Sequence, residues 1–234
     1  MPEPAVYPVA RLDLSFAPRP WPFAVARRGE IDAHFAELQR RKPKLWNGRV
    51  LLLYERRVEG DVFRGSFLEA DYASFVAWQS WGRPDDTVYD CFGAAAVAGA
   101  DGGILLGVMA QHTFNAGEIY FPCGTPDPSD IAGAKVDLDF GVRRELEEET
   151  GLTANDFAAA PGWTAVTRGR TIALIKVLRA RETAEQLRAR ALAHLAREAE
   201  PELADIRIAR GPGDLAPQMR GFTRDFLIDL WRGH

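Results

Sequence analysis

The segment that most constrains the fold of this chain is "VRRELEEETGL", residues 142–152, which holds four glutamates and two arginines in eleven residues. On a helix that advances about 100° per residue, glutamates spaced three, four and one apart fall within an arc of roughly 100°. Glu145, Glu148 and Glu149 have this spacing. Gly151 follows, and glycine suits the left-handed position after a helix. The segment therefore predicts a helix that ends at Gly151 and turns three carboxylates toward one point.

Three carboxylates at such short separations repel one another, and each raises the pKa of its neighbours. A half-buried cluster of this kind is tolerable only when cations neutralise it, and hard oxygen ligands suit Mg²⁺, with Mn²⁺ as the alternative. Arg144 lies four residues before Glu148, so it can hold a carboxylate in orientation. Val142 and Leu146 flank the acidic face and are expected to anchor the helix to a sheet. The alternative is a solvated surface helix, which is common among glutamate-rich segments.

Residues 1–86 predict an accessory α+β lobe. The run "AVYPVARLDLSF" indicates one strand, and "GEIDAHFAELQRRK" places its apolar residues on one helical face. "GRVLLLYERRVEG" and "DVFRGSFLEA" indicate a hairpin, and Asp71 is placed to cap a short helix after it. "GRPDD" marks a boundary before residue 87.

Residues 87–234 predict a second domain with a small mixed sheet. Strand-like runs "VYDCFGAAAVAG", "GGILLGVMAQHT" and "GEIYFPCG" precede the acidic helix, and "GWTAVTRGRTIALIKVLRARE" supplies two more strands after it. Thr183 with Gln186 forms a capping-box pattern for a helix through about Ala199. A last helix carries Phe222, Phe226 and Leu227.

Charge and hydropathy exclude several classes of protein. Twenty-nine Lys and Arg against 33 Asp and Glu leave a formal charge of −4, so nucleic acid is not expected as the main partner. No run of 18 apolar residues occurs, and the N-terminal residues do not resemble a leader, so a membrane role is not expected and the expected location is cytoplasmic. Cys91 and Cys123 lack a metal spacing and are expected as free thiols.

The pattern Arg-Glu-aliphatic-any-Glu-Glu-any-Gly-aliphatic is matched at every specified position from Arg144 to Leu152. A chance match in a chain of this length has a probability on the order of 10⁻⁵ at average residue frequencies. This is the core of the Nudix signature, and the segment from about Val88 to Leu230 resembles the Nudix hydrolase family. The resemblance implies an α/β/α sandwich with a mixed sheet.

Upstream of the signature helix the chain departs from the family pattern. Asp130 stands where the family has a glycine, and Val136 stands where it has a glutamate. If Gly124 is the loop glycine, the loop is about six residues longer than usual, and Pro122-Cys123-Gly124 replaces Pro-Gly-Gly. Asp137 or Asp139 is then the candidate replacement for the missing glutamate.

The resemblance implies metal-dependent attack of water on the diphosphate linkage of a small nucleotide substrate. Glu145, Glu148 and Glu149 match the metal-binding positions, with Arg144 beside them. The signature does not name the catalytic base, and the candidates are Glu198, Glu200 and Glu202, of which Glu200 is our choice. Tyr120, Cys123 and Gly124 are the expected substrate-binding residues. A homodimer is compatible with the resemblance.

"KPKLWNG", the accessory lobe and the long loop before the acidic helix resemble a Nudix subgroup that includes nucleoside-diphosphate-sugar hydrolases. This resemblance implies a UDP-sugar-like substrate. Aromatic residues can stack on a base or sugar, or else belong to the core; the candidates are Trp46, Trp78, Trp81, Tyr120 and Phe121. A catalytically silent Nudix-fold module that binds or regulates remains the alternative to an enzyme.

Overall fold

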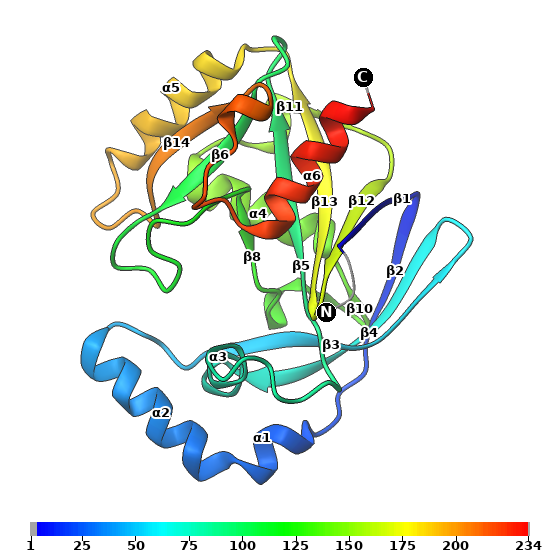
Figure 1. Ribbon diagram of the computed structural model, residues 1–234, viewed down its shortest axis with the longest axis vertical. Helices are drawn as coiled ribbons and strands as arrows, with labels where there is room; N and C mark the ends of the chain where they lie inside the picture. Colours follow the sequence, from blue (N-terminus) through cyan, green and yellow to red (C-terminus); the bar gives the residue numbers. More distant parts are fainter. Residues whose placement is uncertain (1–3, 234) are drawn as a thin grey trace. The chain divides into compact units, whose positions relative to one another are not determined.

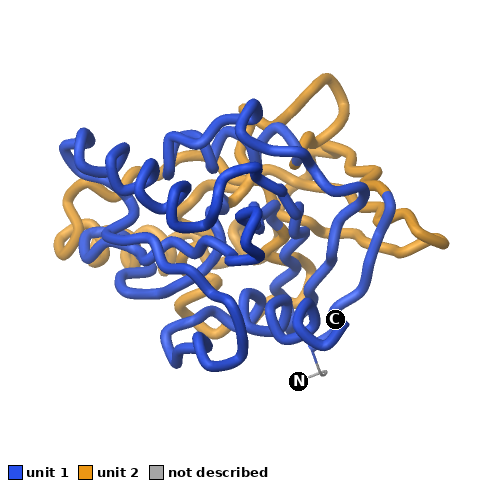
Figure 2. Tube along the Cα trace, turned by 90° about the horizontal axis from the view of Figure 1, so that it is seen from above, with its two compact units in different colours: residues 1–10, 92–124, 139–234 blue, residues 11–91, 125–138 orange. Residues whose placement is uncertain are grey.

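The structure is a computed structural model that describes residues 4–233. The chain divides into two compact units, which Figure 2 shows in different colours. Unit 1 takes residues 1–10, 92–124 and 139–234, and unit 2 takes residues 11–91 and 125–138. The expected domain boundary after residue 86 stays a prediction. The two compact units have different boundaries from it. No helix among residues 4–233 is long and apolar enough to cross a membrane.

Unit 1 is built on a nine-stranded sheet whose main path runs β1-β12-β13-β5-β6-β14 (Figure 1). The path strands are β1 Ala5–Val9, β5 Asp90–Ala98, β6 Ile104–Met109, β12 Trp163–Arg168, β13 Thr171–Ala180 and β14 Leu203–Ala209. The short strands β7 Ile119–Tyr120, β8 Cys123–Gly124 and β11 Phe157–Ala159 pair with β6, β5 and β13. Strand β5 is buried along its whole length, as expected of a central strand covered on both faces.

Three helices pack on this sheet. They are α4 Leu138–Thr150, α5 Ala184–Leu195 and α6 Gly221–Arg232. In Figure 1, α6 lies in front of the central strands and α4 lies behind them. Leu146, Leu187 and Phe226 from the three helices join one buried apolar cluster with the strands. The predicted α/β fold with helices on both sides of the sheet is therefore confirmed.

Unit 2 has a mixed five-stranded sheet in the order β3-β4-β2-β10-β9. Its strands are β2 Arg11–Phe16, β3 Arg49–Glu59, β4 Val62–Asp71, β9 Ile131–Ala132 and β10 Lys135–Val136. Its helices are α1 Pro22–Ala26, α2 Arg28–Arg41 and α3 Tyr72–Ser80. Strands β3 and β4 form the predicted antiparallel hairpin, and β2 pairs parallel to β4. The apolar faces of the helices and the hairpin enclose Trp78, which is fully buried.

Two local expectations are wrong, and one strand was not expected. The run "AVYPVARLDLSF" is two strands in two sheets, because the chain bends at Ala10, and a local pattern does not specify the sheet that a strand joins. Helix α5 ends at Leu195, since residues 196–200 bury no side chain that would hold another turn. Strand β14 has no clear pattern in the sequence, since its buried residues do not alternate with exposed ones, and its pairing with β6 shifts register between Leu203 and Asp205.

Candidate functional site

Helix α4 carries the acidic residues, and its buried face fixes their direction. Val142 and Leu146 are each 2% exposed, as the sequence predicted, whereas Glu147 is exposed. The helix ends at Gly151, whose φ is +67°. A Cβ there would lie 2.7 Å from the His194 ring, so both the backbone conformation and the available space require glycine. His194 Nε2 lies 3.1 Å from the carbonyl oxygen of Glu148 at the end of the helix.

Glu149 is the buried member of the acidic group, with only 7% of its surface exposed. Burial raises the pKa of its carboxyl well above the usual value, and the negative charges of Glu145, Glu202 and Glu148 raise it further. The Oε2 atom of Glu149 accepts no hydrogen bond from any residue in 4–233. A buried carboxylate oxygen without a donor, facing other carboxylates, is a site for a cation.

Glu145 lies directly against the backbone of strand β8. A Cβ built on Gly124 would lie 2.3 Å from Glu145 Cδ and 2.4 Å from its Oε1, so only glycine allows this approach. Arg144 Nη1 lies 2.8 Å from Glu145 Oε1 and 3.3 Å from Glu148 Oε2. The structure thus brings Gly124, Arg144 and Glu145 together, and Arg144 orients two of the predicted carboxylates.

Glu148 differs from the other two carboxylates because its side chain is 60% exposed. Among residues 4–233, no group of three or more His, Cys, Asp or Glu side chains is already arranged to hold a metal ion. Glu148 would have to turn away from Arg144 to join such a group, and an exposed ion pair opposes this movement only weakly. Glu145 and Glu149 nevertheless fit a hard divalent cation, because both offer carboxylate oxygens. One of these oxygens, Glu149 Oε2, is buried and lacks a hydrogen-bond donor.

Tyr120 belongs to the same site. Its side chain is buried, and the pKa of its hydroxyl is raised chiefly by burial, then by Cys123 and, more weakly, by Glu149. The predicted residues Tyr120 and Cys123 are therefore close enough to interact electrostatically. Tyr120 is also close enough to interact with Glu149 on the acidic helix. Phe121, another aromatic candidate, is fully buried in the core.

Two residues that sequence reasoning missed hold Tyr120 in place. Asn115 Nδ2 donates to Tyr120 Oη at 3.1 Å, and Arg220 Nη2 donates to Asn115 Oδ1 at 2.7 Å. The Arg220 guanidinium lies 5.6 Å from the centre of the Tyr120 ring and also pairs with Glu118. Glu118 and Arg220 line a cavity of about 520 Å³ between residues 116–118 and 217–221. No sequence signal joins positions a hundred residues apart in this way.

The three candidates for the catalytic base differ in their surroundings. Glu198 Oε1 lies 3.1 Å from His194 Nε2, and the side chains of all three candidates are exposed. Glu202 is the one of the three whose charge raises the pKa of Glu149. Its carbonyl oxygen accepts the Ala110 N–H at 2.8 Å, which fixes the backbone of Glu202 beside the end of β6. Glu202 therefore has a stronger structural claim than Glu200, which stays a prediction.

The residues that depart from the family pattern have structural roles. Asp130 is 2% exposed, and its Oδ2 accepts the Asp127 N–H at 3.0 Å, which caps the short helix Pro128–Asp130. Val136 is buried in strand β10 of unit 2. Asp139 Oδ2 accepts a hydrogen bond of 2.6 Å from Arg143 Nε. The replacement of the missing glutamate by Asp137 or Asp139 stays a prediction.

The remaining aromatic candidates and the cysteines are also placed. Trp78 is fully buried and Trp81 is partly buried, whereas Trp46 is 81% exposed. Cys91 is buried and Cys123 is partly buried, and neither forms a disulfide, as the sequence predicted. Trp46 is thus the aromatic candidate of unit 2 whose ring is open to solvent.

No family model matches the sequence, and no curated protein matches it. Many solved structures superpose on part of the chain, and three of them are as follows. The Nudix hydrolase RenU from M. smegmatis is 15% identical over 61% of this chain and 83% of that chain, with a TM-score of 0.40. The MutT protein from Methanosarcina mazei Go1 is 19% identical over 62% of this chain and 94% of that chain, with a TM-score of 0.38. A bifunctional NMN adenylyltransferase/ADP ribose pyrophosphatase from Francisella tularensis, solved with AMP and a manganese ion, is 16% identical over 68% of this chain and 46% of that chain, with a TM-score of 0.44.

Proposed function

We propose that this chain is a Nudix-type hydrolase that cleaves the diphosphate linkage of a small nucleotide with the help of a divalent metal ion. One observation carries the proposal. Glu149 lies buried among other carboxylates with an oxygen that has no hydrogen-bond donor, on a helix that matches the complete Nudix signature. A purely structural helix has no reason to bury an uncompensated carboxylate there, because burial of an unpaired charge is strongly destabilising.

Mg²⁺, or Mn²⁺ in its place, would neutralise charge on the bridging phosphates and activate the attacking water. Glu145 and Glu149 would hold this ion, with Glu148 joining them once it leaves Arg144. Arg144 keeps Glu145 in orientation through its 2.8 Å contact. The absence of a side chain at Gly124 leaves room for Glu145 beside strand β8.

The proton of the attacking water passes to a carboxylate base, and we assign this role to Glu202 rather than Glu200. Glu202 stands close enough to raise the pKa of Glu149, and its backbone is fixed by Ala110. Tyr120, whose hydroxyl oxygen accepts a hydrogen bond from Asn115, would donate its own hydroxyl proton to a phosphate oxygen.

The substrate class that suits this site is a nucleoside diphosphate linked to another moiety, with a nucleotide sugar as the narrower proposal. Water adds to one phosphorus atom while the bridging oxygen leaves with the other. The products are then a nucleoside monophosphate and the phosphorylated second moiety. The narrower proposal draws support from the sequence resemblance of "KPKLWNG" and the long loop to the nucleotide-sugar subgroup.

A product assay with Mg²⁺ or Mn²⁺ tests this function across nucleoside diphosphate sugars, ADP-ribose, dinucleotides, coenzyme A and nucleoside triphosphates. Glu149→Gln removes a proposed metal ligand and should lower kcat/KM at least about 100-fold, which corresponds to roughly 3 kcal/mol of transition-state stabilisation. Glu147→Gln, an exposed change on the same helix, is the matched control and should leave the rate unchanged.

Full activity in Glu149→Gln would overturn the metal assignment. If no compound is hydrolysed while one of them still raises the thermal stability of the protein, the chain is instead a binding module that has kept the fold without turnover.

A further inference from the structure

Trp46 lies outside the site described above and is exposed to an unusual degree. Of its surface, 81% is open to solvent, whereas Trp21 and Trp78 in the same unit are at most 3% exposed. Single exposed apolar residues are common, so exposure alone indicates nothing. The exposure of Trp46 is of interest because the backbone on both sides of it is fixed by hydrogen bonds.

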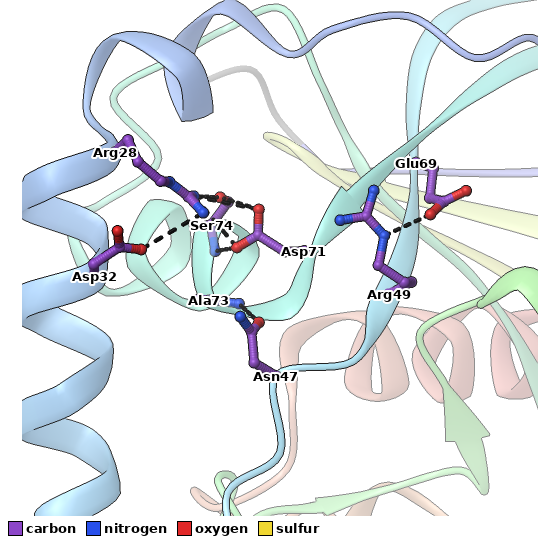
Figure 3. Close-up of polar contacts among 8 residues, drawn as sticks. All are labelled: Arg28, Asp32, Asn47, Arg49, Glu69, Asp71, Ala73 and Ser74. Carbon is purple, nitrogen blue, oxygen red and sulfur yellow. Dashed lines mark hydrogen bonds and ion pairs between the residues drawn. The ribbon is translucent and has the colours of Figure 1, made fainter.

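The loop of residues 42–48 is fixed on both sides of Trp46. Before it, the Leu45 N–H donates to the Lys42 carbonyl at 2.9 Å, and the Leu45 carbonyl accepts Gln39 Nε2 at 3.0 Å. After it, Asn47 Oδ1 accepts the Ala73 N–H at 2.8 Å, so the loop supplies a cap to the first turn of α3 (Figure 3). Leu45 also packs against the buried cluster of unit 2.

The indole itself rests on the loop backbone. A Cβ placed on Gly48 would lie 3.2 Å from Trp46 Cδ1 and 3.3 Å from Nε1, so one side of the ring adjoins Gly48. The Gly48 carbonyl accepts the Tyr72 N–H at 2.9 Å, which fixes this support in turn. One edge of the ring thus lies beside a fixed backbone, and most of its surface is available for binding. A preorganised aromatic face loses little entropy when it binds.

The chain around Trp46 is basic although the protein is acidic. Residues 37–48 contain four positive side chains, Arg40, Arg41, Lys42 and Lys44, and one carboxylate, Glu37, which leaves a charge of 4 − 1 = +3. The whole chain has a formal charge of −4. Glu37 pairs with both arginines at the surface, where such ion pairs are weak.

We propose that the loop of residues 42–48 is a binding site for a nucleoside phosphate, whose base stacks on Trp46 and whose phosphate is attracted by the basic side chains next to it. A fixed, open aromatic face suits any base, and a positive surrounding selects the ligands that also carry phosphate. This site is proposed for unit 2 by itself, and it does not depend on the hydrolase assignment.

Fluorine NMR of the full-length protein labelled with 5-fluorotryptophan tests the site. The Trp46 signal is identified by its loss in Trp46→Phe. EDTA removes divalent metal ions, so that the ligands are not hydrolysed during the measurement. We expect UMP and AMP to move this signal in a saturable way, with binding that weakens as salt is raised. Uridine, which lacks phosphate, and ribose 5-phosphate, which lacks a base, should each bind more weakly.

Variants separate stacking from general attraction. Trp46→Ala should raise the Kd for UMP roughly fivefold or more, because a stacked base contributes on the order of 1–3 kcal/mol. Gly48→Ala, which displaces the indole, should raise the Kd less. The matched control is Val25→Ala, which trims another exposed apolar side chain of unit 2, 69% exposed, and should leave the Kd unchanged.

The proposal is overturned if the Trp46 signal stays still up to about 10 mM UMP and AMP, a concentration above any specific affinity. It is also overturned if Trp46→Ala leaves the Kd unchanged while it converts a dimer to a monomer in sedimentation, since the ring would then serve a second copy of the chain. The same titration is repeated with the Glu149→Gln variant. If UMP still moves the Trp46 signal there, the nucleotide site at Trp46 is supported even when the hydrolase proposal fails.

Discussion

Glu149 is the single residue on which the proposed cation site most depends. Its carboxyl is buried beside Glu145 and Glu202, so its ionised form is unstable in the folded protein without a metal. Folding therefore favours the protonated form, and the proposed cation would favour the ionised form when it binds. Stability, metal affinity and pH should be linked through this group.

The metal-free protein should lose stability as pH rises because of Glu149. The folded pKa is raised above the unfolded value of 4.5, so this contribution is fully present below about pH 4.5 and is lost as pH rises through the folded pKa. Urea unfolding in EDTA between about pH 4.5 and 8 measures the slope, which Glu149→Gln should flatten. Equal slopes in Glu149→Gln and the wild type would contradict the assignment, and Glu147→Gln serves as the control.

Gly124→Ala tests the contact between strand β8 and Glu145. A Cβ there would lie 2.3 Å from Glu145 Cδ, so the carboxylate must move. We expect weaker metal binding, measured as a higher Mg²⁺ or Mn²⁺ concentration for half-maximal activity, with a small change in the thermal melting temperature. Gly211→Ala meets nothing within 4 Å and should change neither quantity. An unchanged metal requirement in Gly124→Ala would argue against Glu145 as a ligand.

At the scale of elements, the start of helix α3 depends on side chains from three segments. Asp71 accepts the Ser74 N–H at 2.9 Å, Arg28 donates to Asp71, and Asn47 caps Ala73 from the loop (Figure 3). Arg49 pairs with Glu69 on the neighbouring hairpin. The capping carboxylate also has a lowered pKa, which burial opposes but the hydrogen bonds from Ser74 and Arg28 outweigh.

Asp71→Ala should lower the free energy of unfolding by about 1–2 kcal/mol, because an N-cap is lost. Asp71→Asn keeps a capping oxygen and should lose less of the free energy of unfolding. The loss that remains in Asp71→Asn measures the contribution of the ion pair between Asp71 and Arg28. Urea unfolding at neutral pH measures both values. A larger loss in Asp71→Asn than in Asp71→Ala would show that the cap is not the source of the stability.

The elements that the sequence predicted are those with local signals. The Asp71 cap, the Thr183 and Gln186 capping box and the glycine end of α4 all act within a few residues. The bulged strand β14 and the split of β1 from β2 were missed, because long-range pairing decides them. The same holds in the site: the acidic face was predictable from helical spacing, whereas Asn115 and Arg220 reach Tyr120 only through the fold.

At the scale of the whole molecule, strand β1 belongs to unit 1 although it comes first in the chain. It pairs with β12 over five residues, from Ala5 opposite Thr167 to Val9 opposite Trp163. A chain of residues 87–234 would lose this strand and expose the edge of β12, and it would keep residues 125–138 without the rest of unit 2.

We therefore expect residues 87–234 to aggregate or to melt without a cooperative transition, which circular dichroism on heating would measure. A chain in which residues 1–10 are joined by a Gly/Ser linker to residues 92–124 and 139–234, with a second such linker in place of 125–138, should fold better. Cooperative melting of residues 87–234 at the wild-type temperature would show that the 86/87 boundary is a true domain boundary.

Unit 2 is made of two internal segments, residues 11–91 and 125–138, and each of them enters and leaves through unit 1. While unit 1 stays folded, opening of unit 2 releases tethered loops and never a free tail. Tethering reduces the entropy gained on opening, although the effect grows only slowly with loop length. A single protease cut within unit 2 would also leave both fragments attached to unit 1, so a nicked molecule should keep its two pieces together until unit 1 itself unfolds.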